Sequence, residues 1–214
     1  SSMVLSWIAL FAYIIIWKKD SYYEKMRCSR FYGPQLRAMW EQLKIGVPIG
    51  LSTFFEVSSF TLMAIFISRF GPVDVSAHQI VANVTSLCYM IALSIGIACT
   101  VLVSQCLGAG YAEVAEKATR RCLILATSLA LIVAFSLYFG RGAILALYTS
   151  DETVIKIAYS LILFGVFYHV FDALQCVGAF ALRGYRVTFW PMVIYGVLLW
   201  CVGLFGGYYM AFYG

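Results

Sequence analysis

The chain has 214 residues, of which 63% are hydrophobic and 12% are charged. A soluble domain is roughly half apolar and about a quarter charged, so this composition leaves too little polar surface for a soluble fold and predicts an integral membrane protein. The net charge of +5 does not indicate nucleic-acid binding, because the basic residues follow the gaps between apolar stretches. No short apolar core followed by a small-residue cleavage site marks a signal peptide.

The cysteines and the motif content argue against an enzyme. The seven cysteines include no CxxC pair and no Cys/His cluster, and we interpret them as small core residues rather than as metal ligands or disulfides. The sequence contains no GxSxG, Walker or HExxH motif, which are signatures of nucleophilic, nucleotide-binding and zinc sites. We therefore predict no enzymatic activity and no cofactor.

Six apolar stretches follow one another along the chain. A spanning helix needs about 20 predominantly apolar residues, which every stretch but the first provides when tilt is allowed for. We predict an all-α, polytopic transmembrane helical bundle of about six spans, and we expect residues 1–17 to be the clipped end of a preceding helix. The stretches cover about residues 3–17, 45–68, 77–106, 122–139, 154–182 and 188–212.

The only long loop, residues 18–44, lies between the first two stretches, is charged and contains Gly33-Pro34. Near its end, apolar residues recur at helical spacing, which fits either a short amphipathic interfacial helix or a solvated linker. These residues are Leu36, Met39, Trp40 and Leu43. Further on, Phe70-Gly71-Pro72 predicts a tight turn, and Pro48 and Pro191 can start or kink the helices that contain them.

The basic residues concentrate in alternate gaps between the stretches. All but three of the 15 Lys and Arg residues lie in the gaps after the first, third and fifth stretches. Because cytoplasmic loops carry an excess of Lys and Arg, these gaps are expected to face the cytoplasm and both ends of the chain to face outward. The three exceptions are Arg69, Arg141 and Lys156.

Only two carboxylates lie inside long apolar stretches, Glu56 and Asp172. An ionised group at the centre of a bilayer costs roughly 2.5 to 3.5 kcal/mol on insertion scales, so such a group is normally kept to bind an ion, a proton or a cationic substrate. The two acids therefore indicate a transporter. Ser52 and Ser59 share a helical face with Glu56, and we interpret both serines as helix-packing contacts or as bonds to the preceding turn.

Tyr168, Asp172 and Gln175 share one face of the fifth stretch. The tyrosine can supply a second oxygen to a small cation such as Na⁺, since hard cations prefer oxygen ligands, or it can hold the carboxylate by a hydrogen bond. Alternatively, Asp172 carries a proton, because burial disfavours the charged form of a carboxyl group. Gln175 is either a substrate contact or a helix-packing residue. His169 points to a different face, and we interpret it as structural.

Polar residues also line one face of the third stretch. Gln79, Asn83 and Ser86 share that face, and Tyr89 lies beside it. They either hydrogen-bond between helices or contact a substrate, and Tyr89 is either a packing residue or an aromatic wall for a cation. Asp151, in the loop before the fifth stretch, is either a solvated acid or part of an acidic mouth that attracts cations.

Three groups of these residues resemble transporters of the multidrug and toxic compound extrusion (MATE) family, of the NorM type. Pro48-Ile49-Gly50 with Phe54-Phe55-Glu56 resembles the seventh helix of that family. Ala77-His78-Gln79-Ile80 with Asn83 resembles the start of the eighth helix, and Tyr168 and Asp172 with Leu182-Arg183-Gly184-Tyr185 resemble the tenth. The resemblance covers nearly the whole chain.

The resemblance implies a twelve-helix fold of two six-helix lobes around a central cavity, in the plasma membrane or the bacterial inner membrane. It implies export of organic cations, such as drugs and dyes, by antiport with Na⁺ or H⁺. On that map, residues 18–44 are the cytoplasmic loop between the lobes, and residues 45–214 are the carboxy-terminal lobe without its final helix. The implied partners are membrane lipids and the missing amino-terminal lobe, with no nucleic acid.

The resemblance also implies roles for particular residues. The coupling-cation site, and the Na⁺ ligands if Na⁺ is the coupling ion, match Glu56, Asp172 and Tyr168. Positions that contact cationic drugs in some members match Gln79, Tyr89 and Asp151, and Asn83 and Gln175 join them as candidate substrate contacts from their shared faces. Two alternatives are compatible with the sequence. One is a lipid-linked saccharide flippase of a related fold, which requires a strongly basic cavity, and the other is a non-transporting membrane fragment.

Overall fold

The structure, a computed structural model, describes residues 5–10 and 35–213. The chain divides into two compact units, Ser1–Gln42 and Leu43–Gly214. Residues 5–10 are helical, and the described residues contain helices and turns but no strand, which confirms the predicted all-α fold. From residue 36 the elements are α2 (Leu36–Ile67), η1 (Ser68–Phe70), α3 (Pro72–Gly108), α4 (Ala112–Tyr148), α5 (Glu152–Gly184), α6 (Phe189–Tyr195), η2 (Gly196–Phe205) and α7 (Gly206–Phe212).

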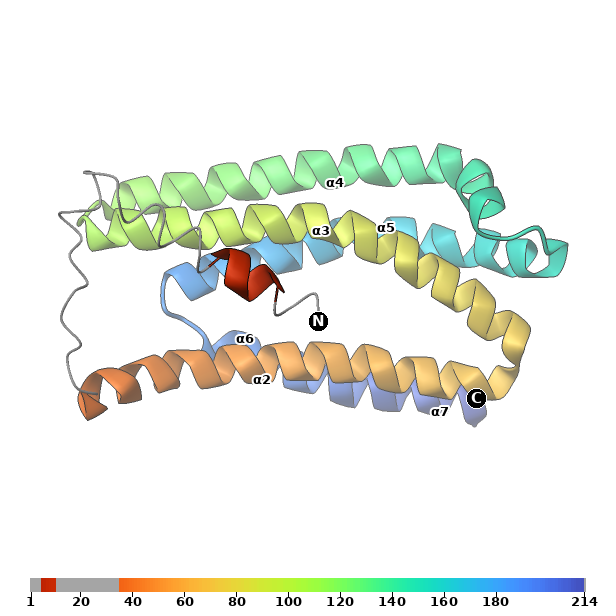
Figure 1. The fold of residues 1–214 in the computed structure, drawn as a ribbon, viewed down its shortest axis with the longest axis horizontal. Helices are drawn as coiled ribbons and strands as arrows, with labels where there is room; N and C mark the ends of the chain where they lie inside the picture. Colours follow the sequence, from red (N-terminus) through yellow and green to blue (C-terminus); the bar gives the residue numbers. More distant parts are fainter. Residues whose placement is uncertain (1–4, 11–34, 214) are drawn as a thin grey trace. The chain divides into compact units, whose positions relative to one another are not determined.

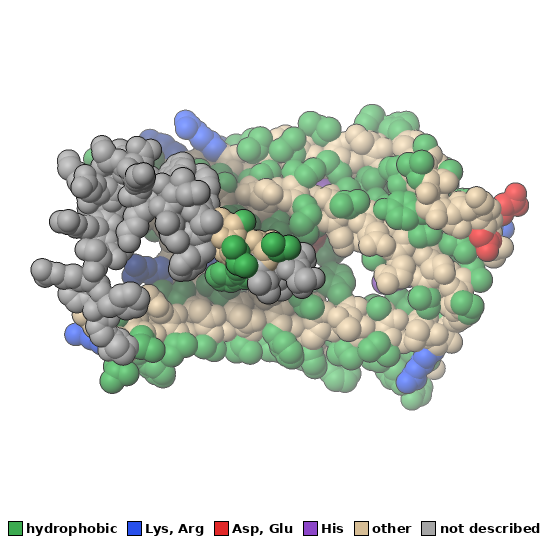
Figure 2. All heavy atoms as spheres, viewed as in Figure 1, with side chains coloured by type: hydrophobic (Ala, Val, Ile, Leu, Met, Phe, Trp, Pro, Cys, Tyr) green, Lys and Arg blue, Asp and Glu red, His purple; other side chains and the backbone are tan. Residues whose placement is uncertain are grey.

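Five helical segments of the described chain are long and apolar enough to cross a membrane, with α6, η2 and α7 joined in one span, Phe189–Phe212. They correspond to the second to sixth predicted stretches. Most of the first stretch lies outside the described residues. Figure 2 shows hydrophobic side chains exposed along the helices, and Leu87, Phe135 and Phe164 are 67%, 68% and 76% exposed. Such a surface suits lipid rather than water, which confirms an integral, multi-pass membrane protein.

Two helix boundaries differ from the sequence prediction. The helical spacing from Leu36 to Leu43 is confirmed, but these residues form the first turns of α2 and not a separate interfacial helix or a linker. Helix α4 begins at Ala112 and ends at Tyr148, well beyond the apolar stretch at 122–139. Its 37 residues extend about 55 Å, whereas hydropathy marks only the part within a hydrocarbon core about 30 Å thick.

Tight turns place neighbouring helices antiparallel. The predicted turn at Phe70-Gly71-Pro72 is confirmed, with Gly71 at φ 120° and Pro72 as the first residue of α3. Glycine adopts this positive φ without the steric cost of a side chain, and proline suits the first helical position because it lacks an N–H group. Gly110, at φ 83°, turns the chain from α3 into α4 in the same way.

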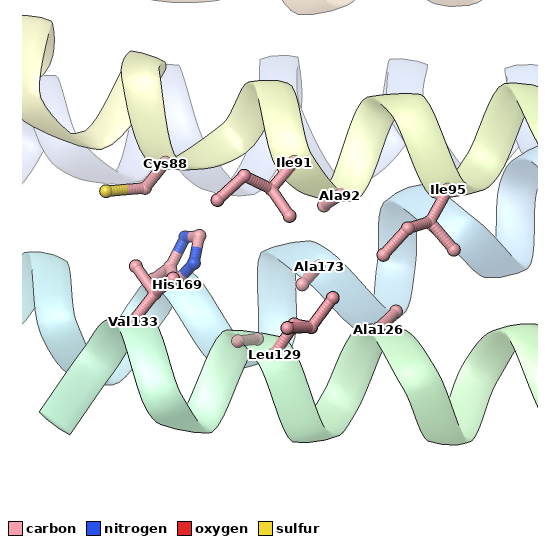
Figure 3. Close-up of a pocket in the computed structure, with 10 residues that line it drawn as sticks. Cys88, Ile91, Ala92, Ile95, Ala126, Leu129, Val133, His169 and Ala173 are labelled. Atoms are coloured by element: carbon pink, nitrogen blue, oxygen red, sulfur yellow. The ribbon is translucent and has the colours of Figure 1, made fainter. Parts of the chain in front are cut away.

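Helices α3, α4 and α5 pack together (Figure 1), and small side chains lie between them. At one closely packed interface, Ala92, Ala130 and Ala173 are all buried. Figure 3 shows this interface, where the His169 ring from α5 also lies among apolar side chains of α3 and α4. His169 is 4% exposed, so its place on a different face from Asp172 is confirmed.

Helix α2 packs against the last span through polar and aromatic contacts. The Ser59 hydroxyl donates to the carbonyl oxygen of Leu199 at 3.4 Å, and the Trp200 indole N–H donates to the carbonyl oxygen of Phe55 at 3.3 Å. The rings of Phe66 and Tyr208 lie 5.1 Å apart. Within this span, η2 is a π-helical segment, a rare form that in proteins often marks functional sites.

Candidate cation site

Glu56 occupies the polar face of α2 that the sequence indicated. Ser52, one turn earlier, is buried and donates to the carbonyl oxygen of Pro48 at 2.8 Å, and Ser59 bonds to the last span. Both serines therefore have the packing roles that were expected of them. Glu56 itself is half-buried, and its Oε1 accepts a hydrogen bond from the Tyr89 hydroxyl of α3 at 3.4 Å.

Asp172 occupies the polar face of α5, also half-buried. The Tyr168 hydroxyl, one turn earlier on the same helix, donates to Asp172 Oδ1 at 3.0 Å. Of the two arrangements that the spacing allowed, the structure therefore contains the tyrosine–carboxylate hydrogen bond. The contact holds the carboxylate in its orientation through Oδ1.

The two carboxylates belong to one site. Glu56 lies within electrostatic reach of Asp172 and of Arg183, although 84 residues of chain separate the end of α2 from the start of α5. Tyr89 joins the helices, because it donates to Glu56 and accepts a hydrogen bond from the Cys176 thiol of α5 at 3.5 Å. Side chains from α2, α3 and α5 thus meet around a pair of acids.

Two members of this site were missed by the sequence interpretation. Tyr195 of α6 is 7% exposed, and its hydroxyl lies near Gln175 and within electrostatic reach of Glu56. Nothing in the sequence distinguishes it from the other tyrosines. Cys176 could have been predicted from helical spacing, because it lies one turn after Asp172 on α5. From the sequence, all cysteines were instead interpreted as core residues.

The arrangement suits a small cation or a proton. Two carboxylates in one half-buried site repel each other when both are ionised, so a bound cation or proton stabilises the pair. Tyr89, Tyr168 and Tyr195 add hydroxyl oxygens, which hard cations accept as ligands. No group of three or more His, Cys, Asp or Glu side chains is assembled as a metal site within residues 5–10 and 35–213. Na⁺ binding here would therefore depend on tyrosine oxygens and water beside the two carboxylates.

The predicted substrate contacts divide into two groups. Tyr89 belongs to the acidic site, and Gln175 lies beside Tyr195 at its margin. Gln79 and Asn83 are exposed on α3, about 15 Å and about 9 Å along the helix from Tyr89. Asp151 caps α5, because its Oδ1 accepts from the backbone N–H of Thr153 at 2.8 Å, and it lies about 32 Å along the helix from Asp172.

The electrostatics of the site do not resemble the strongly basic cavity that a lipid-linked saccharide flippase requires. Within the described chain, Arg183 is the basic residue in electrostatic reach of Glu56. Its single positive charge is outnumbered by the two carboxylates of the site. Membrane-spanning helices that bring paired acids together inside their apolar spans define a multi-pass membrane protein of the transporter class.

The family model described as MatE matches residues 48–209, and the chain belongs to the MatE family. This confirms the resemblance stated from the sequence motifs. The family is one of transporters and not of enzymes, in agreement with the absence of enzyme motifs.

Its relatives include proteins named "Probable multidrug resistance protein NorM" in several bacteria. The one from Aromatoleum aromaticum is 39% identical over 214 residues, which is 100% of this chain and 46% of the relative. The one from Neisseria meningitidis serogroup B is 33% identical over 213 residues, 99% of this chain and 46% of the relative. The one from Geobacillus kaustophilus is 38% identical over 178 residues, 82% of this chain and 38% of the relative. The chain spans less than half the length of these relatives.

Proposed function

We propose that this chain forms the carboxy-terminal lobe of a secondary active multidrug efflux transporter, which exports organic cations by antiport with Na⁺ or H⁺. The observation that carries the proposal is the acidic site, where Glu56 of α2 and Asp172 of α5 lie within electrostatic reach of each other and tyrosines of α3 and α5 bond to them. The names of the relatives as multidrug resistance proteins support the same conclusion.

The mechanism follows from charge. With its site empty, the carboxylate pair is negative and attracts a cation, whether organic or inorganic. When Na⁺ or H⁺ enters from outside and offsets part of the negative charge of the pair, the site attracts an organic cation less strongly and its release is favoured. Two ligands that each weaken the binding of the other are coupled by linkage, and this negative coupling is what antiport requires.

Each residue of the acidic site has a separate role in this mechanism. Glu56 and Asp172 supply the charge, Tyr168 orients Asp172 through its 3.0 Å hydrogen bond, and Tyr89 holds Glu56 toward α5. Because these groups belong to three helices, occupancy of the site changes the interactions between α2, α3 and α5. The organic cation has four further candidate contacts along its path beside the site, namely Gln175, Gln79, Asn83 and Asp151.

The test is ethidium efflux from energised cells that express a complete transporter containing this lobe, in Na⁺ buffer and in Na⁺-free buffer. We expect Asp172→Asn and Glu56→Gln to abolish efflux. Na⁺-stimulated efflux in the wild type indicates Na⁺ coupling, and efflux that ignores Na⁺ but still requires Asp172 indicates H⁺ coupling. The matched control is Glu113→Gln, since Glu113 is an exposed acid in the first turn of α4. Efflux retained by both acid variants would falsify the proposal.

A further inference from the structure

Three basic residues lie outside the gaps that the loop charges assign to the cytoplasm, and only one of them has an evident structural role. The Arg141 guanidinium lies over the rings of Tyr138 and Tyr159, at 4.8 Å and 4.0 Å from their centroids. Lys156 is exposed near the start of α5. Arg69, which is also exposed, lies in η1, where α2 ends, and so at the depth where a span leaves the hydrocarbon core.

Arg69 lies at the end of a groove between α2 and the last span, with a volume of about 330 Å³. One wall carries Leu62, Phe66 and Arg69 at helical spacing, and the groove follows α2 for about 10 Å. Its opposite wall is formed by residues of η2 and α7, namely Trp200, Leu204, Phe205 and Tyr208. The lining is apolar or aromatic apart from the guanidinium at one end.

The guanidinium is available to a ligand. Within the described part of the chain, no carboxylate forms an ion pair with Arg69. Its contact is with the Phe212 ring, 5.5 Å from the guanidinium carbon, which holds the side chain toward α7 and over the end of the groove. An arginine fork matches the geometry of a phosphate group and binds it through paired hydrogen bonds.

The chemistry of the groove selects among possible occupants. An organic cation would be repelled by Arg69. A free inorganic phosphate would satisfy the guanidinium but would leave the apolar walls uncovered. A phospholipid with a net negative head group fits both the charged end and the apolar walls of the groove. Its phosphate binds Arg69, and an acyl chain covers Phe66, Leu204 and Phe205. A zwitterionic lipid carries a positive group beside its phosphate, so its electrostatic attraction to Arg69 is weaker.

We propose that this groove binds one anionic phospholipid, with its phosphate on Arg69 and an acyl chain between α2 and η2. The residues that line the groove are different from those of the acidic site. Because the lipid contacts both α2 and the last span, it fills a gap between two helices that also contact each other directly, for example through Ser59 and Leu199.

The test is quenching of tryptophan fluorescence by brominated lipids in a purified, reconstituted transporter that contains this lobe. The contribution of Trp200 is obtained by subtracting the signal of Trp200→Phe. We expect brominated phosphatidylglycerol to occupy the site with about fivefold preference over brominated phosphatidylcholine, the effect of one basic residue on an anionic lipid. Equal quenching by the two lipids overturns the proposal.

Two variants and a competition complete the experiment. Arg69→Gln is expected to abolish the preference, and Lys156→Gln, which removes another exposed basic residue assigned to the outer side, is expected to keep it. A preference that survives in Arg69→Gln rules out the assigned head-group contact. In the wild type, unbrominated phosphatidylglycerol should relieve the quenching and inorganic phosphate should not. Relief by inorganic phosphate as large as that by unbrominated phosphatidylglycerol would show that the site recognises a phosphate group without its acyl chain, and would overturn the proposal.

Discussion

The Tyr168–Asp172 contact is the shortest hydrogen bond between the side chains of the acidic site, at 3.0 Å, against 3.4 Å for Tyr89–Glu56 and 3.5 Å for Cys176–Tyr89. A hydrogen bond to a charged group contributes more than one between neutral groups. Tyr168 therefore has the largest expected effect on how Asp172 binds a cation, although its side chain is 46% exposed.

Tyr168→Phe removes one hydroxyl and keeps the ring. With Na⁺ as the coupling ion, we expect the half-saturating Na⁺ concentration for ethidium efflux to rise roughly fivefold, because the site loses an oxygen ligand or a hydrogen bond contributing about 1 kcal/mol. The measurement is the Na⁺ dependence of the efflux rate. Tyr148→Phe, an exposed tyrosine at the end of α4, is the matched control. An unchanged Na⁺ dependence in Tyr168→Phe removes this tyrosine from the coupling site.

At the same scale, the sequence identified the acids and their local neighbours but not the tertiary ones. Glu56 and Asp172 could be found because a charge inside an apolar stretch has few structural explanations. The Tyr168–Asp172 bond follows from helical spacing alone. Tyr195 could not be predicted, because its position depends on how α6 packs against α5, and no local pattern in the sequence carries that information.

At the scale of elements, α3 and α5 approach closely because glycines face bulky neighbours. A Cβ atom on Gly184 would lie 2.9 Å from Val103 and 3.2 Å from the carbonyl oxygen of Thr100, and one on Gly96 would lie 3.0 Å from Phe180. The short separation permits the bond from the Thr100 hydroxyl to the Phe180 carbonyl oxygen, at 2.6 Å. This packing fixes the register between the helices that carry Tyr89 and Asp172.

Gly184→Ala is therefore expected to destabilise the protein by about 1–3 kcal/mol, the usual cost of overpacking. Thermal unfolding of the purified protein in detergent measures the change. Gly178→Ala is the matched control on the same helix, because a Cβ at Gly178 meets nothing within 4 Å. Adding Val103→Ala to Gly184→Ala should restore part of the loss. Equal melting temperatures for Gly184→Ala and Gly178→Ala would mean that the contact does not limit packing.

Sequence patterns described the elements better in their centres than at their ends. The apolar stretches predicted the number of full spans. Glycine and proline predicted the turn at Gly71, because both residues have a direct steric effect on the backbone there. They did not give the length of α4, because a helix can continue beyond the hydrocarbon core as an amphipathic segment. They also did not reveal the π-helical turns of η2, whose flanking glycines are equally common in ordinary transmembrane helices.

At the scale of the larger unit, two sets of packed helices are apparent within the described residues 43–213. One is α3, α4 and α5, and the other is α2 with the last span. The Tyr89–Glu56 hydrogen bond joins the two sets, and the electrostatic interaction between Glu56 and Asp172 acts across the same boundary. A cation that binds between the two carboxylates therefore changes how the two sets interact, which is the property that a coupling site needs.

If Glu56 and Asp172 hold one cation between them, their substitutions cannot act independently. We expect Na⁺, or lower pH if the coupling ion is H⁺, to raise the melting temperature of the wild-type transporter, because a ligand that binds the folded state stabilises it. Glu56→Gln and Asp172→Asn should each remove most of this ligand-dependent increase, and the double variant should remove no more than either alone. Residues that act on one shared ligand are non-additive in this way.

The control Glu113→Gln should keep the full increase. Losses that add in the double variant would instead mean two separate cation sites, one on each set of helices, and the hydrogen bond through Tyr89 would then be a packing contact and not part of the coupling.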